Sequence, residues 1–390
     1  MDTAPPREVE PELEGEEEAE HPVTPLELFF DLVFVFALTQ VTGFMSDDPT
    51  WAGVGRGLLI LAALWWAWGA YAWLTNEIDP NEGSARLAVF GAMAAMFVAA
   101  LAVPHAFDTD AVLFGLAYFA VRAMHIVLFA EATPHVDVRQ AAFRLARTAI
   151  PGPALLIVAG FLDGGVQIAC WLLALAIDYS GPYIFGVRGF VVSAEHFAER
   201  YGLIVIIALG ESIVAIGIGA AGLELSATVV IAAVLGLVLA CVLWWAYFDV
   251  VALVARKKLM EARGHDRARL ARDSFSYLHL PMFAGIVLVA LGAKKVLAHV
   301  DAPLETVPAF ALCGGVALYL LSHDAIRYRS VGSVNPRRVL AAVACAALMP
   351  VATRVDGVVS LALVAGVCVA LIAYETLRFR QTRARIRTAV

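Results

Sequence analysis

Long apolar stretches, separated by short polar breaks, run along the chain from residue 24 to residue 377. Several of them exceed about 18 residues with almost no charge, which is enough to cross a hydrocarbon core of about 30 Å as a helix. The pattern predicts an all-α polytopic membrane protein with about 12 transmembrane helices. The predicted helices cover residues 24–45, 55–77, 85–104, 110–131, 142–162, 165–187, 197–220, 227–254, 274–298, 304–325, 336–353 and 356–377.

The composition agrees with a chain that is embedded in a membrane. Of the 390 residues, 61% are hydrophobic and 16% are charged, whereas a soluble domain is about half apolar and about one-quarter charged. All five cysteines lie inside predicted helices, so neither a disulfide framework nor a zinc site is expected. No phosphate-binding or metalloenzyme motif is present, and we expect neither a cofactor nor a bound metal.

Basic residues are distributed unevenly between the two predicted membrane faces. All but five of the 28 Lys and Arg fall on the side that holds both termini. The five exceptions are Arg56, Arg122, Lys294, Lys295 and Arg354. The positive-inside rule therefore predicts a multi-pass protein of the cytoplasmic (inner) membrane with both termini in the cytoplasm. The basic segments suit anionic lipid headgroups, and no nucleic-acid partner is expected.

Weak internal similarity relates the two halves of the chain. "FFDLVFVFALTQ" (29–40) resembles "RYGLIVIIALGE" (200–211), and "LWWAW" (64–68) resembles "LWWAY" (243–247). Asp178, near the end of the sixth predicted helix, corresponds to Glu375, near the end of the twelfth. The similarity predicts two parallel six-helix repeats, as in parallel-repeat transporters. The predicted organisation is a disordered acidic cytoplasmic tail (1–22), a first repeat (23–190), a second repeat (191–378) and a basic cytoplasmic tail (379–390).

Carboxylates inside apolar helices are the main candidates for a functional site. A charge at bilayer depth costs about 2.5–3.5 kcal/mol on insertion scales, so such residues face the protein interior or water. Glu211 lies about three turns into the seventh predicted helix. Glu27 and Asp31 are spaced i,i+4, which places them on one helix face. His196 and Arg200 have the same spacing at the start of the seventh helix.

Arg122 and His125 on the fourth predicted helix are the candidate partners of these acids. We expect Arg122 to join Glu211 and Asp31 in one ion-paired or hydrogen-bonded network. A static salt bridge that holds the helices in register, and capping of helix N-termini by first-turn acids such as Glu27, remain alternatives.

Two motifs resemble those of the bacterial low temperature requirement A (LtrA) family. They are "HPVTPLELFFDLVFVFALTQVT" (21–42) and "HFAERYGLIVIIALGESI" (196–213). The resemblance implies an integral membrane protein with no settled biochemical activity. The polar residues of the family motifs map onto Glu27, Asp31, His196, Glu199, Arg200, Glu211 and Ser212.

The leading hypothesis is a transporter or ion-conducting protein, with proton coupling as one form of it. Glu211 would titrate, Arg122 would be its counter-charge, and Asp31, Glu27, His196 and Glu199 would form the cytoplasmic entrance. The small ion or molecule that it carries is not indicated, and assembly into a homo-oligomer is left open. The alternatives are an intramembrane enzyme of lipid or isoprenoid metabolism, which lacks a paired acidic run here, and a membrane scaffold or sensor.

Overall fold

The computed structural model describes residues 22–78, 80, 83–132 and 136–381, which form a helical bundle without a named strand. The predicted acidic tail, except for Pro22, and residues 382–390 of the basic tail lie outside the described residues. The first part of the chain forms α1 (Pro25–Asp47), α2 (Trp51–Glu77), α3 (Gly83–Ala102), η1 (Val103–His105), α4 (Ala111–Ala132), α5 (Val136–Ala149), α6 (Pro151–Ala159) and α7 (Gly164–Ile184).

The second part begins with the long helix α8 (Ala194–Ala220) and ends with α16 (Gly357–Arg378). Between them lie α9 (Ala227–Ala246), η2 (Tyr247–Val251), α10 (Ala252–Glu261), α11 (Gly264–Leu270), η3 (Ala271–Tyr277), α12 (His279–Ala298), α13 (Thr306–Val331), α14 (Pro336–Ala347) and α15 (Met349–Ala352). The elements η2 and η3 are π-helical turns inside two long continuous helices.

Within the described residues, 10 helical segments are long and apolar enough to cross a membrane. Helices occupy all of the predicted ranges, but α7 and the pair α14–α15 do not meet this requirement. In α7, Gln167, Asp178 and Pro182 reduce the apolar character, and α14 is only 12 residues long. The structure therefore shows fewer candidate spans than the sequence predicted.

Proline interrupts two helices at corresponding places in the chain. The segment that holds α5 and α6 breaks at Ile150, directly before Pro151, and the segment that holds α14 and α15 breaks at Leu348, two residues before Pro350. Proline cannot donate a backbone hydrogen bond, and its ring clashes with the preceding turn. Each break separates a more polar opening helix from a short apolar one.

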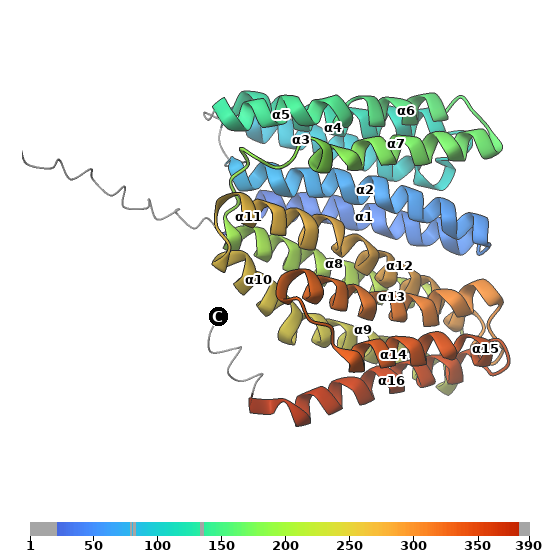
Figure 1. The fold of residues 1–390 in the computed structure, drawn as a ribbon. Coiled ribbons are helices and arrows are strands. Elements are labelled where there is room, and N and C mark those ends of the chain that lie inside the picture. Colours follow the sequence, from blue (N-terminus) through green and yellow to red (C-terminus); the bar gives the residue numbers. More distant parts are fainter. Residues whose placement is uncertain (1–21, 79, 81–82, 133–135, 382–390) are drawn as a thin grey trace, which may run out of the picture.

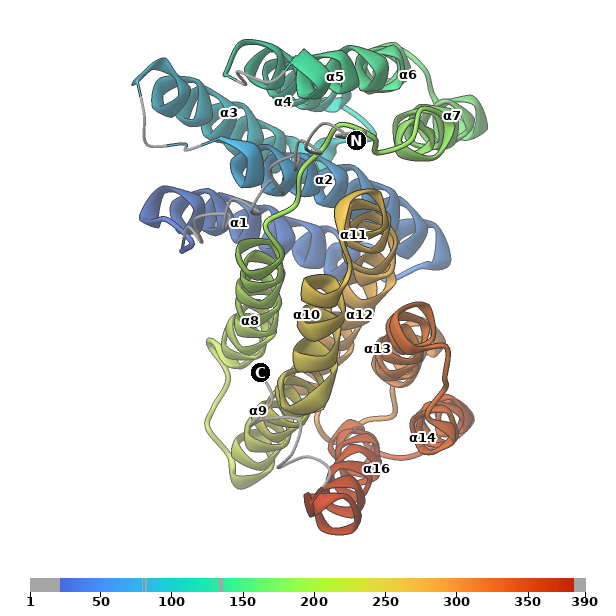
Figure 2. The same cartoon turned by 60° about the vertical axis from the view of Figure 1, so that its left-hand side comes forward.

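The helices run side by side, with α1 beginning and α16 ending at the same end of the bundle (Figure 1). Viewed from near this end, α1–α7 form one half and α8–α16 the other, and α1 and α2 lie next to α8 and α12 in the middle (Figure 2). The segments Ala227–Glu261 and Gly264–Ala298 each have 35 residues, or about 50 Å at helical rise. Helices α10 and α11 therefore extend past a hydrocarbon core and carry the basic segment predicted as a loop.

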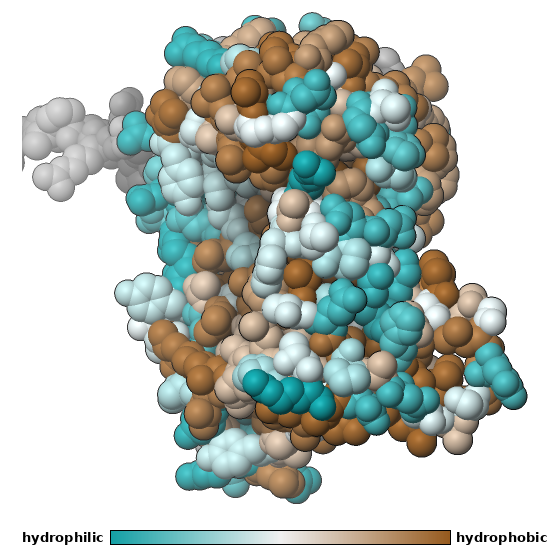
Figure 3. All heavy atoms as spheres, turned by 90° about the vertical axis from the view of Figure 1, so that its right-hand side faces the viewer, coloured by the Kyte–Doolittle hydropathy of each residue, from teal (hydrophilic) through white to brown (hydrophobic). Residues whose placement is uncertain are grey.

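The outer face of the bundle is apolar. Leu87, Phe161 and Leu377 have exposed fractions of 71%, 74% and 80%, and a water-soluble monomer rarely leaves such an extended apolar surface uncovered. Figure 3 faces the end of the bundle away from the termini and shows many hydrophilic side chains across its middle. This distribution suits a chain whose sides contact lipid and whose ends contact water.

Helices α12 and α13 pack closely because glycines face each other between them. A Cβ atom built on Gly285 would lie 2.8 Å from the Gly315 carbonyl oxygen, and one on Gly315 would lie 2.9 Å from the Gly285 carbonyl oxygen. Small residues let membrane helices approach at backbone distance. This contact holds α13 against α12, the most buried helix of the second half.

Candidate functional site

Four charged side chains form a cluster between α1 and α8, which we call the interhelix charge cluster: Glu27, Asp31, His196 and Arg200. The Nε2 atom of His196 lies 3.1 Å from Oε1 of Glu27, and Nη1 of Arg200 lies 2.9 Å from the same oxygen. Nη2 of Arg200 donates to Oδ1 of Asp31 at 2.9 Å. Partners of the Glu27–His196 and Asp31–Arg200 pairs are each 169 residues apart in the chain, so α1 and α8 run parallel in constant register.

Local structure positions the acidic side of this cluster. Thr24 caps α1 in a capping box, in which the Thr24 amide donates to Oε2 of Glu27 at 2.8 Å. The predicted capping role of Glu27 is thus present together with its ion pairs. The spacing of Glu27 and Asp31 then sets both carboxylates on the helix face that meets α8.

The cluster is buried and includes one residue that the sequence did not point to. The exposed fractions of Asp31 and Arg200 are 0% and 1%. Trp68 of α2 donates from Nε1 to Oδ1 of Asp31 at 2.8 Å, and its ring lies 5.9 Å from the Arg200 guanidinium carbon. The run of tryptophans was visible in the sequence, but nothing in its spacing singled out Trp68.

The formal charges of the cluster do not cancel. It contains two carboxylates, one permanently charged guanidinium and one imidazole, so it is neutral only when it holds one further proton. Oδ2 of Asp31 and Nε of Arg200 are buried without a hydrogen-bond partner. A small cavity with room for about one water molecule adjoins the cluster and is lined by Glu27, Arg200 and Thr75. The cluster therefore has unused hydrogen-bonding capacity and nearby space.

Glu211 lies on the same side of α8, 11 residues after Arg200, or about 16 Å along the helix. Its exposed fraction is 1%, and neither carboxyl oxygen has a hydrogen-bond partner among the described residues. Thr42 and Lys294 are the polar side chains close enough to act on it, but the Thr42 hydroxyl donates to the Leu38 carbonyl at 3.1 Å. Thr42 and Glu211 are again 169 residues apart (211 − 42), which extends the parallel register of the two helices.

Arg122 does not pair with Glu211, and the predicted network of Arg122, Glu211 and Asp31 is wrong. Arg122 donates from Nη2 to Oδ1 of Asp178 at 2.7 Å and from Nε to Oδ2 at 3.2 Å. The Tyr118 hydroxyl donates to the same carboxylate at 2.9 Å. These contacts link α4 to α7 inside the first half of the bundle, so the counter-charge of the cluster is Arg200 instead.

A similar pair joins helices of the second half. Glu375 of α16 accepts from Nη2 of Arg338 at 3.0 Å and from Nε at 3.1 Å. Nη1 of Arg338 donates to Nδ1 of His323 at 2.9 Å. Arg338 was missed in the sequence because it begins α14 within a basic stretch that was interpreted as a cytoplasmic loop. Asp178 and Glu375, predicted to correspond, thus each accept two hydrogen bonds from one arginine.

The structure does not bring Glu199 and Ser212 into the interhelix charge cluster. Glu199 is exposed on the side of α8 that faces Phe248 and Arg256 across an open groove. The Ser212 hydroxyl donates to the Ala208 carbonyl at 3.4 Å. His125 of α4 is buried near Arg122, also outside the interhelix charge cluster. In the part of the chain that the structure describes, no group of three or more His, Cys, Asp or Glu side chains is arranged to hold a metal ion.

Comparison with known proteins identifies the family. The model of the bacterial low temperature requirement A protein (LtrA) matches residues 22–373, a range that includes both halves of the bundle and every member of the charge cluster. The chain belongs to the LtrA family. It is also 33% identical over 290 residues to the uncharacterized protein RA0937 of Rhizobium meliloti (strain 1021), covering 70% of this chain and 69% of that protein.

The family assignment makes this LtrA protein a multi-pass membrane protein, in agreement with its apolar helices. Neither the family description nor the name of the relative states a reaction or a transported species. The functional argument for this LtrA protein therefore rests on its buried charges and cavities.

Proposed function

We propose that this LtrA protein is a transporter or ion-conducting protein of the inner membrane, in which proton binding at the interface of α1 and α8 drives its function. The single observation that carries the proposal is the interhelix charge cluster, which is buried at 0–5% exposure and lacks one positive charge for neutrality. Buried charges inside a membrane protein are costly and mark ion pathways and proton relays.

The position of the cluster supports this role. In the proposed architecture, 12 membrane-crossing segments form two parallel repeats, and α1 and α8 are the first helices of each. The proline breaks before α6 and within α14–α15, and the matched Arg122–Asp178 and Arg338–Glu375 pairs, favour this division. Ion pairs that cross between the halves respond to any relative movement of the halves, whereas pairs within one half do not.

Proton uptake offers a way to change the energy of this interface. The guanidinium of Arg200 is permanently charged, so one added proton on His196 or on a carboxylate makes the cluster neutral. Such a change weakens or strengthens individual ion pairs without moving the backbone. In a static bridge, by contrast, the same atoms would only hold α1 and α8 in register, an outcome known for other buried ion pairs.

Glu211 is proposed as a second protonation site on the same interface. Its carboxyl is buried without a hydrogen-bond partner among the described residues. Burial of this kind favours the protonated, uncharged carboxyl over the carboxylate. Positioned about 16 Å from Arg200 along α8, it would mark a deeper step on a path through the membrane. Both chain ends are proposed to be cytoplasmic, with the basic extensions of α10 and α11 next to anionic lipids.

Proton flux in proteoliposomes tests this function. A potassium gradient with valinomycin sets the membrane potential, and an internal pH dye reports proton entry. We expect flux above that of protein-free liposomes and its loss in Glu211→Gln and Asp31→Asn. Glu224→Gln, which changes an exposed loop acid, is the matched control and should keep the flux. Equal flux with and without wild-type protein between about pH 5 and pH 8 would exclude proton conduction and favour a scaffold or sensor. Wild-type flux in Glu211→Gln would exclude Glu211 from the mechanism.

A further inference from the structure

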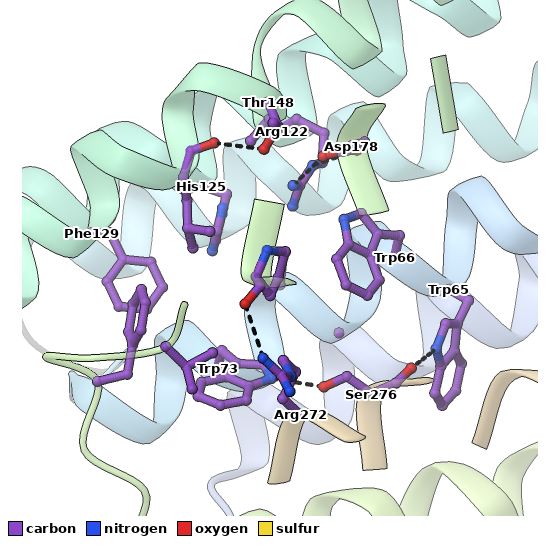
Figure 4. A pocket seen from close by; sticks show the side chains of 17 residues that line it. Trp65, Trp66, Trp73, Arg122, His125, Phe129, Thr148, Asp178, Arg272 and Ser276 are labelled. Carbon is purple, nitrogen blue, oxygen red and sulfur yellow. Dashed lines mark hydrogen bonds and ion pairs between the residues drawn. The ribbon is translucent and has the colours of Figure 1, made fainter. Parts of the chain in front are cut away.

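An aromatic cavity in the first half of the bundle has no role in the proton pathway proposed above. It lies between α2, α4, α5 and α7, is closed on one side by η3, and has a volume of about 630 Å³ including its mouth (Figure 4). Its lining resembles that of small-molecule sites, which are mainly apolar with a few placed polar groups.

One end of this cavity carries buried polar atoms that have no hydrogen-bond partner of good geometry among the residues that the structure describes. Arg122 uses Nε and Nη2 for Asp178, and its Nη1 atom is buried without a partner. Neither ring nitrogen of His125 makes a hydrogen bond of good geometry, although the Ala70 backbone in the cavity wall lies beside the ring. The two side chains are 4% and 3% exposed. In Figure 4 they lie at the same end of the cavity.

Hydrogen-bond donors without a partner lower the stability of a protein when they are buried. A buried polar group without a partner costs about 1–3 kcal/mol, more when it is charged. Two adjacent side chains with such atoms therefore favour an occupant that supplies hydrogen-bond acceptors. This argument is independent of proton conduction, because neither residue belongs to the interhelix charge cluster.

The remaining wall is aromatic and held in place. Trp66 stacks on Tyr179 with ring centroids 4.0 Å apart, and Trp73 donates from Nε1 to the Ser276 hydroxyl at 2.8 Å. Phe190 meets the Trp73 ring edge-on at 5.8 Å. With their rings fixed by these contacts, the tryptophans offer flat apolar surface for the body of a ligand.

The charged side chains of the lining decide which head group the cavity favours. Arg122 is paired with Asp178, and Arg272 is paired with Asp273, which lies outside the lining. Arg272 is held outside the polar end by Asp273 at 2.7 Å and by the Pro182 carbonyl at 3.0 Å. Because Asp178 already accepts hydrogen bonds from Tyr118 and Arg122, whereas Nη1 of Arg122 is an unused donor, the polar end favours an oxygen anion over an amine.

We propose that this cavity binds a small amphipathic carboxylate, with its apolar body against Trp66 and Trp73 and its carboxylate accepting hydrogen bonds from Nη1 of Arg122 and from His125. His125 donates from one ring nitrogen in its neutral form. The site would hold its ligand whether or not the protein conducts protons.

Binding of a matched probe series to the full-length protein in nanodiscs tests the proposal. Cyclohexanecarboxylate, cyclohexylmethanol and cyclohexylmethylamine share one ring and do not absorb where tryptophan emits. Binding is followed by tryptophan fluorescence and checked by calorimetry. We expect the carboxylate to bind most tightly, the alcohol at least fivefold more weakly, and the amine not at all at the same concentration.

Substitutions of His125 test whether this side chain contributes to ligand binding in a protein that is still folded. His125→Phe keeps a ring of similar size but removes the hydrogen bond to the ligand. It should weaken carboxylate binding about tenfold, which is the low end of what one hydrogen bond to a charged group contributes. His125→Asn keeps an N–H donor and should retain more affinity than His125→Phe. His265→Phe, in exposed α11, is the control and should leave the affinity unchanged.

Three results would overturn the inference. One is an amine that binds the wild type as tightly as the carboxylate does. Another is the absence of any fluorescence or heat response to the carboxylate up to about 10 mM, a concentration at which millimolar binding is saturated. The third is equal affinity in the wild type and in folded His125→Phe. The probe series with wild-type protein decides the first two even if a variant does not fold.

Discussion

Asp31 of α1 and Arg200 of α8 form an ion pair of 2.9 Å in which both side chains are almost fully buried. The two residues are 169 positions apart in the chain. Their contact links the two halves of the bundle: Glu27 also binds Arg200, Trp68 binds Asp31, and His196 joins the cluster through Glu27.

Removal of Arg200 should destabilise the protein more than removal of Asp31. Arg200→Gln leaves two buried carboxylates without their cation, and breaking a buried pair in this way costs about 3–5 kcal/mol. Asp31→Asn leaves Arg200 with Glu27 and keeps an acceptor for Trp68, so its cost should be smaller. Thermal unfolding of the detergent-purified proteins measures the order, with Glu224→Gln as an exposed control. The reverse order would show that Asp31, not Arg200, holds the cluster together.

Glu211→Gln should leave stability unchanged or raise it. The wild-type carboxyl is buried without a hydrogen-bond partner, and its charged form is costly there, so a neutral side chain of the same shape removes no stabilising contact. The melting temperature should therefore stay the same or increase while proton flux is lost. A large fall in melting temperature would instead reveal that Glu211 makes a structural bond in the membrane.

Gly285→Ala should loosen the contact between α12 and α13. The added methyl group would lie 2.8 Å from the Gly315 carbonyl oxygen, and overpacking of this kind costs about 1–3 kcal/mol. Gly217→Ala in α8 is the matched control, because a Cβ atom there meets nothing within 4 Å and alanine is favoured over glycine in a helix by about 0.5–1 kcal/mol. Opposite shifts in melting temperature are expected for the two variants, and equal shifts would contradict the close packing.

Membrane orientation is checked by labelling of introduced cysteines. His265→Cys in α11 and Thr109→Cys between η1 and α4 lie at opposite ends of the bundle. In whole cells a membrane-impermeant thiol reagent should label Thr109→Cys only, whereas His265→Cys should require disrupted cells. Parallel labelling of the unmodified protein controls for its native cysteines. Labelling of His265→Cys from outside would invert the proposed topology.

The polar positions of α1 and α8 were predictable because each interrupts an apolar run. Glu27, Asp31, His196, Arg200 and Glu211 were all selected from the sequence, and all five are buried in the structure. Helical periodicity also placed the pairs at i,i+4 on common faces. Their partners could not be predicted in the same way, because periodicity reports the face of one helix and says nothing about which helix covers it.

The ion-pair partners of Arg122 and Arg338 could not be predicted from the sequence. Arg122 was assigned to Glu211 because both lie deep in apolar helices, but its side chain reaches Asp178 on α7. Arg338 lies at the polar start of α14, and a short amphipathic segment rich in arginine is typical of a loop as well as of a buried helix end. Of the 12 predicted spans, 10 are confirmed as long and apolar enough among the described residues, because α7 and α14–α15 contain too many polar residues or are too short.

By itself the sequence determined that the protein lies in a membrane, that it is helical, and which polar side chains are unfavourable in contact with lipid. These properties follow from local composition, because each apolar stretch must satisfy its own backbone hydrogen bonds in lipid. Only the tertiary structure decided which charges meet, that Arg200 and not Arg122 faces Asp31, and that an aromatic cavity surrounds unused donors. Those contacts join residues 37–169 positions apart, and they are set by how helices pack, which no single helix encodes.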